Sequence, residues 1–170
     1  MLKMNGISKN ELKLVSDMEF RKKYYFCLKD IAFHFVNQKQ MRNTIYTLRK
    51  KGRIIRLSKN KYFLVPIKAR HGKWTDYPLI IVDEMFNGQD YFVGGWYAAH
   101  YWRLTDQIPM QVDVFTTKRQ GKINLLNSRF VFHRTTAQRI KTKSIVREIG
   151  KHHFKILSKR EATKWMKSRR

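Results

Sequence analysis

The sequence has one cysteine, few acidic residues and no long apolar run, and each shortage excludes a class of protein. Cys27 is the single cysteine, so an intramolecular disulfide framework is excluded and a reducing compartment is favoured. No apolar run approaches the roughly 18 residues that can span a bilayer, and the first residues lack the apolar core of a signal peptide. We therefore expect a soluble cytoplasmic protein with no membrane partner.

The shortage of acid leaves a large positive charge. The chain has 12 Asp and Glu against 37 Lys and Arg, which gives a formal charge of +25 and a pI near 10.5. Such an excess predicts a polyanionic partner, and nucleic acid is the first candidate. Basic residues outnumber acidic ones by 18 to 4 in residues 1–70 and by 17 to 2 in residues 117–170, whereas residues 71–116 hold 2 against 6. Two basic blocks therefore flank a mildly acidic, aromatic-rich middle.

Residues 37–65 carry the clearest structural pattern. Met41, Ile45 and Leu48 recur at helical spacing, which predicts an amphipathic helix from residue 38 to about residue 51. Gly52 is typical of the position just after a helix. This helix would have one buried stripe and a basic, hydrogen-bonding outer surface.

Two β-prone runs follow the helix. Residues 53–57 alternate in polarity and residues 62–65 are rich in aromatic and apolar side chains, with a polar turn at 58–61 between them. Pro66 ends the second run. A helix followed by a basic hairpin is typical of a recognition helix with a wing.

The segments before this helix complete the same pattern. Ser8 and Glu11 form a capping-box signature that opens a helix ending near residue 23. Residues 24–27 read as a short strand, and the apolar spacing of residues 28–35 predicts a second helix. Three helices and a two-stranded wing indicate a winged helix-turn-helix.

The predicted fold class is α+β, with an N-terminal winged helix-turn-helix followed by a small mixed α/β domain. We expect the domains to span residues 1–67 and 76–170, joined by a basic linker at 68–75. In the second domain we expect helices at 76–86, at 96–102 and after Ser158, strands at 91–93, 112–115 and 128–134, and a hairpin of 145–149 with 153–157.

The winged helix predicts contacts with duplex DNA through its third helix and wing. Arg42 can grip guanine with two donors, while Gln40 and Asn43 can pair with adenine in the same bidentate manner. The other candidates suit phosphates, which fix register without carrying sequence information. They are Lys39, Tyr46, Arg49, Lys50, Arg53, Arg56, Lys59 and Lys61. A protein-docking role with a merely solvated basic surface is the alternative.

A secondary basic surface is expected in the C-terminal block. Its candidates are Lys118, Arg119, Lys122, Arg134, Arg139, Lys141, Lys143 and Arg147. They could contact DNA that flanks the winged-helix site, receive an acidic partner protein, or simply be solvated. The sequence does not decide between these three interpretations.

Two further functions compete with duplex binding. The first is a basic RNA-binding protein, associated with ribosomes, that uses the aromatics and both basic blocks on structured RNA. The second is a metal-dependent nuclease, because Asp113 with Gln120-Gly121-Lys122 faintly resembles a carboxylate–lysine site for Mg²⁺. That spacing is short, a second carboxylate is missing, and no Cys or His cluster has zinc spacing. We therefore expect no enzyme, no metal and no cofactor.

One run resembles a known family. The run from Tyr91 to Pro109, YFVGGWYAAHYWRLTDQIP, is similar to the core of the AbiE antitoxin family, and the basic wing with its tyrosine at 56–64 agrees with it. The matching positions are the small residues Gly94 and Gly95, then Ala98, Leu104, Gln107 and Pro109. The resemblance extends over most of residues 28–157.

Three features depart from the family pattern. Lys61 stands where a glycine is common before the wing tyrosine, and Tyr101-Trp102 replaces a short His-Gly pair. The chain stops soon after residues 158–162, where family members generally continue through further helices. This would make it either a compact variant or a truncated chain.

The resemblance implies an antitoxin and autorepressor of a type IV abortive-infection toxin–antitoxin system, with residues 76–170 as the antitoxin domain. Such a protein represses its own operon by binding inverted repeats in the promoter, and it opposes a nucleotidyltransferase-like toxin. The resemblance leaves open whether antitoxin and toxin touch. It supplies no catalytic residue.

Overall fold

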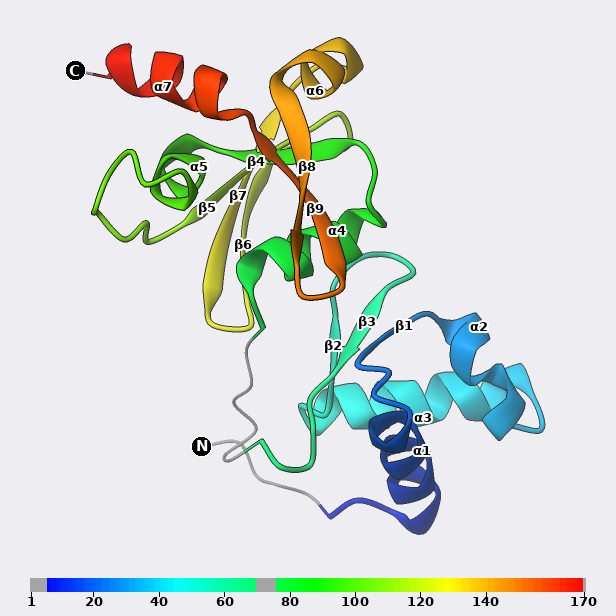
Figure 1. Ribbon diagram of the computed structural model, residues 1–170. Helices are drawn as coiled ribbons and strands as arrows, with labels where there is room; N and C mark the ends of the chain where they lie inside the picture. Colours follow the sequence, from blue (N-terminus) through cyan, green and yellow to red (C-terminus); the bar gives the residue numbers. More distant parts are fainter. Residues whose placement is uncertain (1–5, 70–75, 170) are drawn as a thin grey trace. The chain divides into compact units, whose positions relative to one another are not determined.

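The computed structural model describes residues 6–69 and 76–169 (Figure 1). The chain divides into two compact units, Met1–Trp74 and Thr75–Arg170. Helices with a small three-stranded sheet form the first unit, and helices with a six-stranded mixed sheet form the second, so the fold is a mixed α+β one. Of the predicted linker, residues 70–75 lie outside the described residues. No helix in the described part is long and apolar enough to cross a membrane.

The first unit begins with a helix that its sequence caps. Ser8 Oγ accepts from the Glu11 amide at 3.3 Å, and the Glu11 carboxylate accepts from the Ser8 amide at 2.7 Å, which confirms the predicted capping box. The elements are α1 Lys9–Phe20, β1 Tyr25–Phe26, α2 Leu28–Ile31, the 3₁₀ turn η1 Ala32–His34, α3 Gln38–Lys50, β2 Ile54–Arg56 and β3 Tyr62–Leu64. The helix predicted over 28–35 is therefore split, because the chain tightens at Ala32 and is extended at Phe35 before it enters α3.

The core of the first unit lies between these helices and an antiparallel sheet of order β1-β3-β2. Leu14, Val15 and Met18 of α1 meet Met41, Ile45 and Leu48 of α3 in one buried cluster. Leu48 and Phe26 are fully buried, and burial of a side chain of this size stabilises the fold by about 1.5–3 kcal/mol. The apolar face predicted for residues 38–51 is thus the face that packs inward.

The end of α3 follows a Schellman motif. The Gly52 amide donates to the Arg49 carbonyl at 3.0 Å, and the Arg53 amide donates to the Leu48 carbonyl at 2.9 Å. Gly52 has a φ of +71°, a conformation that glycine adopts without strain. The glycine therefore stops the helix and turns the chain into β2, as the sequence predicted.

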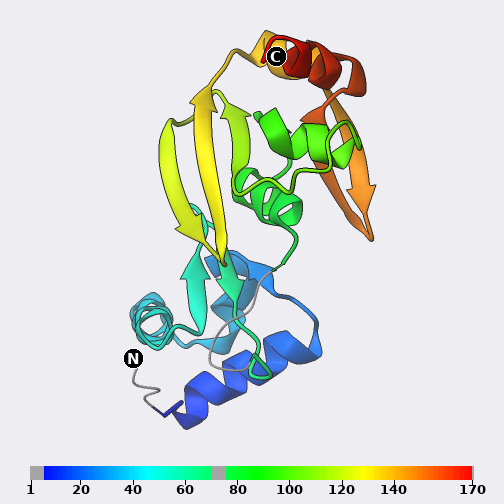
Figure 2. The ribbon, with the colours of Figure 1, turned by 90° about the vertical axis from the view of Figure 1, so that its left-hand side faces the viewer.

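The second unit is built on a twisted sheet of order β6-β7-β5-β4-β9-β8. Its elements are α4 Pro78–Phe86, β4 Tyr91–Gly94, α5 Gly95–Tyr101, β5 Val112–Thr116, β6 Gly121–Leu125, β7 Ser128–Arg134, α6 Ala137–Lys143, β8 Ser144–Ile149, β9 His152–Leu157 and α7 Lys159–Lys167. The pairs β5–β7 and β4–β9 are parallel, and the others are antiparallel. Figures 1 and 2 show β5, β6 and β7 side by side.

Helix α4 packs on the sheet around Tyr91. The fully buried Tyr91 hydroxyl donates to Asp83 at 2.6 Å and accepts from the Lys155 amide at 3.0 Å. The Phe86 ring of α4 stacks on Tyr91 with 5.5 Å between ring centroids, and it lies 6.0 Å from the ring of Phe132. Burial and the hydrogen bond to Asp83 raise the pKa of Tyr91 far above its ordinary value, so its proton stays in place.

Candidate nucleic-acid interface

Helix α3 has two opposite faces. Met41, Ile45 and Leu48 are 7%, 5% and 0% exposed and pack inward. The outward stripe recurs every three or four residues and consists of Lys39, Arg42, Asn43, Tyr46, Arg49 and Lys50, all exposed. The Lys50 ammonium lies 4.7 Å from the centroid of the Tyr46 ring. The stripe is therefore a continuous surface of cationic and hydrogen-bonding side chains.

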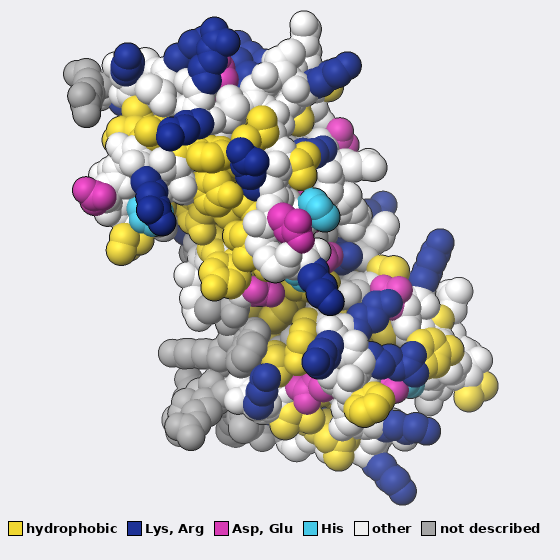
Figure 3. All heavy atoms as spheres, viewed as in Figure 1, with side chains coloured by type: hydrophobic (Ala, Val, Ile, Leu, Met, Phe, Trp, Pro, Cys, Tyr) yellow, Lys and Arg dark blue, Asp and Glu magenta, His cyan; other side chains and the backbone are white. Residues whose placement is uncertain are grey.

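The helix that carries this stripe contains no acidic residue. The sequence contains no Asp or Glu between Asp30 and Asp76, so α3 and the β2–β3 hairpin are entirely free of acid. The acids of α1 and α2 are engaged elsewhere: Asp17 pairs with Arg21 and His34 at 3.0 Å, and Asp30 pairs with Lys23 at 2.8 Å. On the face drawn in Figure 3, Lys and Arg side chains are spread over both units with acidic ones scattered among them.

Glu11 fixes α3 against α1 from the opposite side. Its buried carboxylate accepts from Lys51 Nζ at 2.5 Å and from Thr47 Oγ1 at 2.7 Å. Burial alone would raise the pKa of Glu11, but the hydrogen bonds from Lys51, Ser8 and Thr47 lower it to about 2. Glu11 thereby neutralises Lys51, which was not among the predicted contacts, and leaves the outer stripe charged.

The start of α3 presents the residues predicted to read bases. Asn37 caps the helix, because its side chain accepts from the Gln40 amide at 2.8 Å. Gln40 uses its Oε1 to accept from the Val36 amide at 3.2 Å, so part of its hydrogen-bonding capacity holds the helix entry. Arg42 and Asn43 line a shallow hollow of about 350 Å³ that also includes Tyr46 and Arg49. The structure thus brings four of the predicted contact residues together.

The hairpin residues divide into two groups. Arg53 is half-buried and donates to the Pro66 carbonyl at 3.3 Å, and Arg56 donates to the Ser58 and Lys59 carbonyls at 3.0 and 3.1 Å. Both arginines therefore shape the hairpin, in addition to their predicted role with phosphates. Lys59 is exposed at the turn, and Lys61 is half-buried, with its carbonyl accepting from Leu57 and Ser58.

The residues of the predicted secondary basic surface have different local surroundings. Lys118 pairs with Asp90 at 3.0 Å, Arg119 lies 4.1 Å from the centroid of the Phe132 ring, and Arg147 lies 5.2 Å from that of Trp102. Lys122, Arg134 and Lys141 are exposed, and only Arg139 and Lys143 line the large cavity of this unit.

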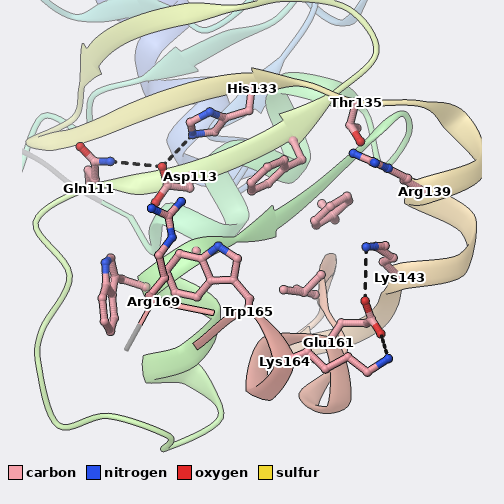
Figure 4. A pocket seen from close by; sticks show the side chains of 15 residues that line it. Gln111, Asp113, His133, Thr135, Arg139, Lys143, Glu161, Lys164, Trp165 and Arg169 are labelled. Carbon is pink, nitrogen blue, oxygen red and sulfur yellow. Dashed lines mark hydrogen bonds and ion pairs between the residues drawn. The ribbon is translucent and has the colours of Figure 1, made fainter. Parts of the chain in front are cut away.

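That cavity has a volume of about 780 Å³ (Figure 4). Its floor is a row of rings on three neighbouring strands: Phe92 stacks on Phe115 at 5.0 Å, and Phe115 stacks on His133 at 4.8 Å. Trp96 and Trp165 meet edge to face at 5.2 Å beside it. Sequence patterns could not reveal this site, because the parallel pairing of β5 with β7 brings its floor together.

The residues proposed for a nuclease are separated by a strand. Asp113 of β5 and Lys122 of β6 both pair with Val131 of β7, which lies between them. Asp113 is buried and accepts from His133 at 2.8 Å and from Gln111 at 3.1 Å. Within residues 6–69 and 76–169, no group of three or more His, Cys, Asp or Glu side chains could hold a metal ion.

Neither a scan against models of protein families nor a search of curated proteins finds a significant match for the chain.

Proposed function

We propose that the chain is a DNA-binding transcriptional autorepressor whose first unit is a winged helix-turn-helix. The observation that carries the proposal is the exposed, acid-free stripe of α3, held opposite a buried apolar stripe. The order of three helices and a basic β2–β3 hairpin supports it, because winged domains place a recognition helix directly before the wing.

In this proposal α3 enters the major groove with its N-terminal half toward the bases. Arg42 is exposed, and its guanidinium can donate to O6 and N7 of guanine, while the Asn43 amide can both donate to and accept from adenine. Lys39, Arg49 and Lys50 lie along the same face and would bind phosphates. The sequence preference would therefore come from Arg42 and Asn43, and the affinity from their cationic neighbours.

The hairpin would act as a wing along the backbone. The hydrogen bonds of Arg56 to two carbonyls fix the turn, so Lys59 is presented by a shaped loop. A lysine at this place contributes charge without reading bases. Removal of Lys59 should therefore weaken binding to all duplexes alike.

The antitoxin role rests on the resemblance of residues 91–109 and 56–64 to the AbiE family. We propose that the protein represses the operon that encodes it, through inverted repeats in the promoter, and that it opposes a nucleotidyltransferase-like toxin. The second unit would be the antitoxin domain.

A gel-shift titration tests the DNA-binding proposal. The full chain is titrated against its own upstream promoter, a scrambled duplex and a structured RNA at two salt concentrations. We expect at least ~10³-fold tighter binding to the promoter than to the scrambled duplex. The Arg42→Ala change should cost about 1–3 kcal/mol on the promoter and erase much of the preference, whereas Lys59→Ala should preserve the preference.

Equal affinity for all three nucleic acids, with a steep loss at high salt, would overturn the repressor proposal. That result would show that the positive charge binds polyanions electrostatically and without sequence preference. A preference for the structured RNA would instead favour the RNA-binding function.

A further inference from the structure

Tyr46 is the one aromatic residue on the outward stripe of α3, and the contacts proposed above give it no role. Its side chain is 55% exposed. Within the described part of the chain, its hydroxyl has no hydrogen-bond partner. The first unit therefore does not depend on this side chain for its fold, and the ring is available to a binding partner.

Tyr46 lies in the middle of the stripe. Successive residues of a helix are turned by about 100°, which places Arg42 and Arg49 to one side of the tyrosine. Asn43 and Lys50 lie to its other side. When a helix enters the major groove, the middle of its exposed face meets the base edges, and the flanks lie nearer the walls that carry the phosphates. Tyr46 is therefore placed to meet bases.

Lys50 restrains the Tyr46 ring on this surface. Its ammonium lies 4.7 Å from the centroid of the ring, a distance at which a cation is attracted to an aromatic face. The ring also lines the shallow hollow of about 350 Å³ together with Arg42 and Asn43. The aromatic surface is thus held beside the two residues proposed to read bases, and a restrained ring loses less conformational freedom when a partner covers it.

An aromatic ring at this place can distinguish thymine from the other bases. The 5-methyl group of thymine is the apolar group that base pairs present in the major groove, where the other bases present hydrogen-bond donors and acceptors. The cations of the stripe already suit the phosphates, so a phenol ring would add little to the backbone contacts. Contact with the methyl group would instead remove apolar surface of both partners from water.

We propose that Tyr46 reads the 5-methyl group of a thymine in the operator. The inference rests on the proposed entry of α3 into the major groove, and it gives Tyr46 a base contact in place of the phosphate contact that the sequence predicted. Arg42 lies one turn earlier, about 6 Å along the helix, and bases in a strand are about 3.4 Å apart. The thymine therefore lies within about two base pairs of the guanine that Arg42 binds.

Replacement of single thymines by uracil in the promoter tests the proposal, because uracil lacks only the 5-methyl group. Each thymine of the bound site is replaced in turn, and binding of the full chain is titrated by gel shift. At one thymine, the replacement should weaken binding roughly fourfold, which is the effect of losing the burial of one methyl-sized group.

Two variants of Tyr46 separate the ring from the hydroxyl. Tyr46→Phe keeps the ring and should still distinguish thymine from uracil. Tyr46→Ala should bind the two promoters equally, and its unfolding curve should match that of the parent because the side chain is exposed. Lys39→Ala is the matched control, since it removes a cation from the same stripe and should weaken both promoters to the same extent.

Three results would overturn the proposal. The parent chain could bind every uracil promoter as tightly as the thymine promoter, Tyr46→Ala could still distinguish the two, or Tyr46→Phe could lose as much affinity as Tyr46→Ala. In each case, if Arg42→Ala still erases the promoter preference, the proposed function stands and the role of Tyr46 alone is wrong. Absence of any promoter preference in the parent chain would overturn the proposed function, and this inference with it.

Discussion

The two units carry similar numbers of cationic residues and use them in opposite ways. In the first unit, the cations of α3 stand on an open surface in a stretch without any acid, and no carboxylate lies among them. In the second unit, Arg139, Lys143 and Lys164 line a cavity together with two carboxylates and a row of aromatic rings. An open acid-free stripe is suited to an extended polyanion, whereas Glu161 partly neutralises Lys143 and Lys164 in the second unit. Net charge alone would not separate the two units, because the neighbours of each cation decide how it is used.

The largest expected effect is on the buried side of α3, because the open stripe depends on it. Leu48→Ala removes a fully buried side chain and should lower the free energy of unfolding of the first unit by about 2–5 kcal/mol. Urea unfolding followed by hydrogen exchange of the α3 amides measures this loss. Leu12→Ala is the control, since Leu12 is 46% exposed on α1 and should cost less than about 0.5 kcal/mol. Equal losses would show that α3 is not held by its apolar face.

The next effect concerns the hydrogen bonds that hold the second unit. Tyr91→Phe removes the hydroxyl that donates to Asp83 and accepts from Lys155, and it leaves both partners without that bond. We expect the free energy of unfolding to fall by about 1–3 kcal/mol. Hydrogen exchange at the Lys155 amide should rise more than at amides of β6, which is remote from this bond in the order of the sheet. Unchanged protection at Lys155 would contradict this role of Tyr91.

A smaller effect, in pH dependence, sharpens the contrast between the units. The pKa of Glu11 is lowered to about 2 in the folded chain, so its contribution to stability is full above the ordinary value near 4.5 and is lost as pH falls toward 2. The pKa of Asp83 is raised, chiefly by burial, so its ionisation costs stability as pH rises through the raised value. Lowering the pH should therefore reduce the stability of the first unit by protonating Glu11, and it should remove the destabilising charge of Asp83 from the second unit.

Unfolding of the Glu11→Gln variant, measured between pH 2 and pH 6, isolates the contribution of the Glu11 carboxylate to stability. The variant should be less stable than the parent chain at pH 6, and the difference should shrink as the pH approaches 2. Asp83→Asn should behave in the opposite way. It removes a group whose ionisation is destabilising, so its effect on the free energy of unfolding should be most favourable at the higher pH. A constant difference for Glu11→Gln across the range would show that its carboxylate has an ordinary pKa.

The parts of the fold that sequence predicted are those with local signals. The Ser8 capping box, the bounds of α3 and the hairpin of β8 and β9 follow from caps, spacing and turn residues within a few positions of each other. Two elements were missed. Strand β6 begins Gly121-Lys122 and includes Asn124, a pattern too polar to predict a strand, and α6 buries only Ile140 in the described chain.

The candidate sites differ in the same respect. The stripe of α3 could be predicted because it lies on one helix, where spacing in sequence fixes position in space. The cavity could not, because Phe92, Asp113, His133 and Trp165 come together through the strand order β7-β5-β4 and the packing of α7. Long-range pairing of this kind leaves no periodic mark in the sequence.

The salt dependence of promoter binding tests the central claim most directly. Binding of the full chain is titrated over a series of salt concentrations for the parent, for Arg49→Ala/Lys50→Ala on α3, and for Lys9→Ala/Lys13→Ala on α1, which removes the same charge from the same unit. We expect the slope of log affinity against log salt to become shallower by about 0.9 for each lost phosphate contact in the α3 variant and to stay unchanged in the α1 variant. Equal slopes in both variants would contradict the claim that the exposed stripe of α3 holds the duplex.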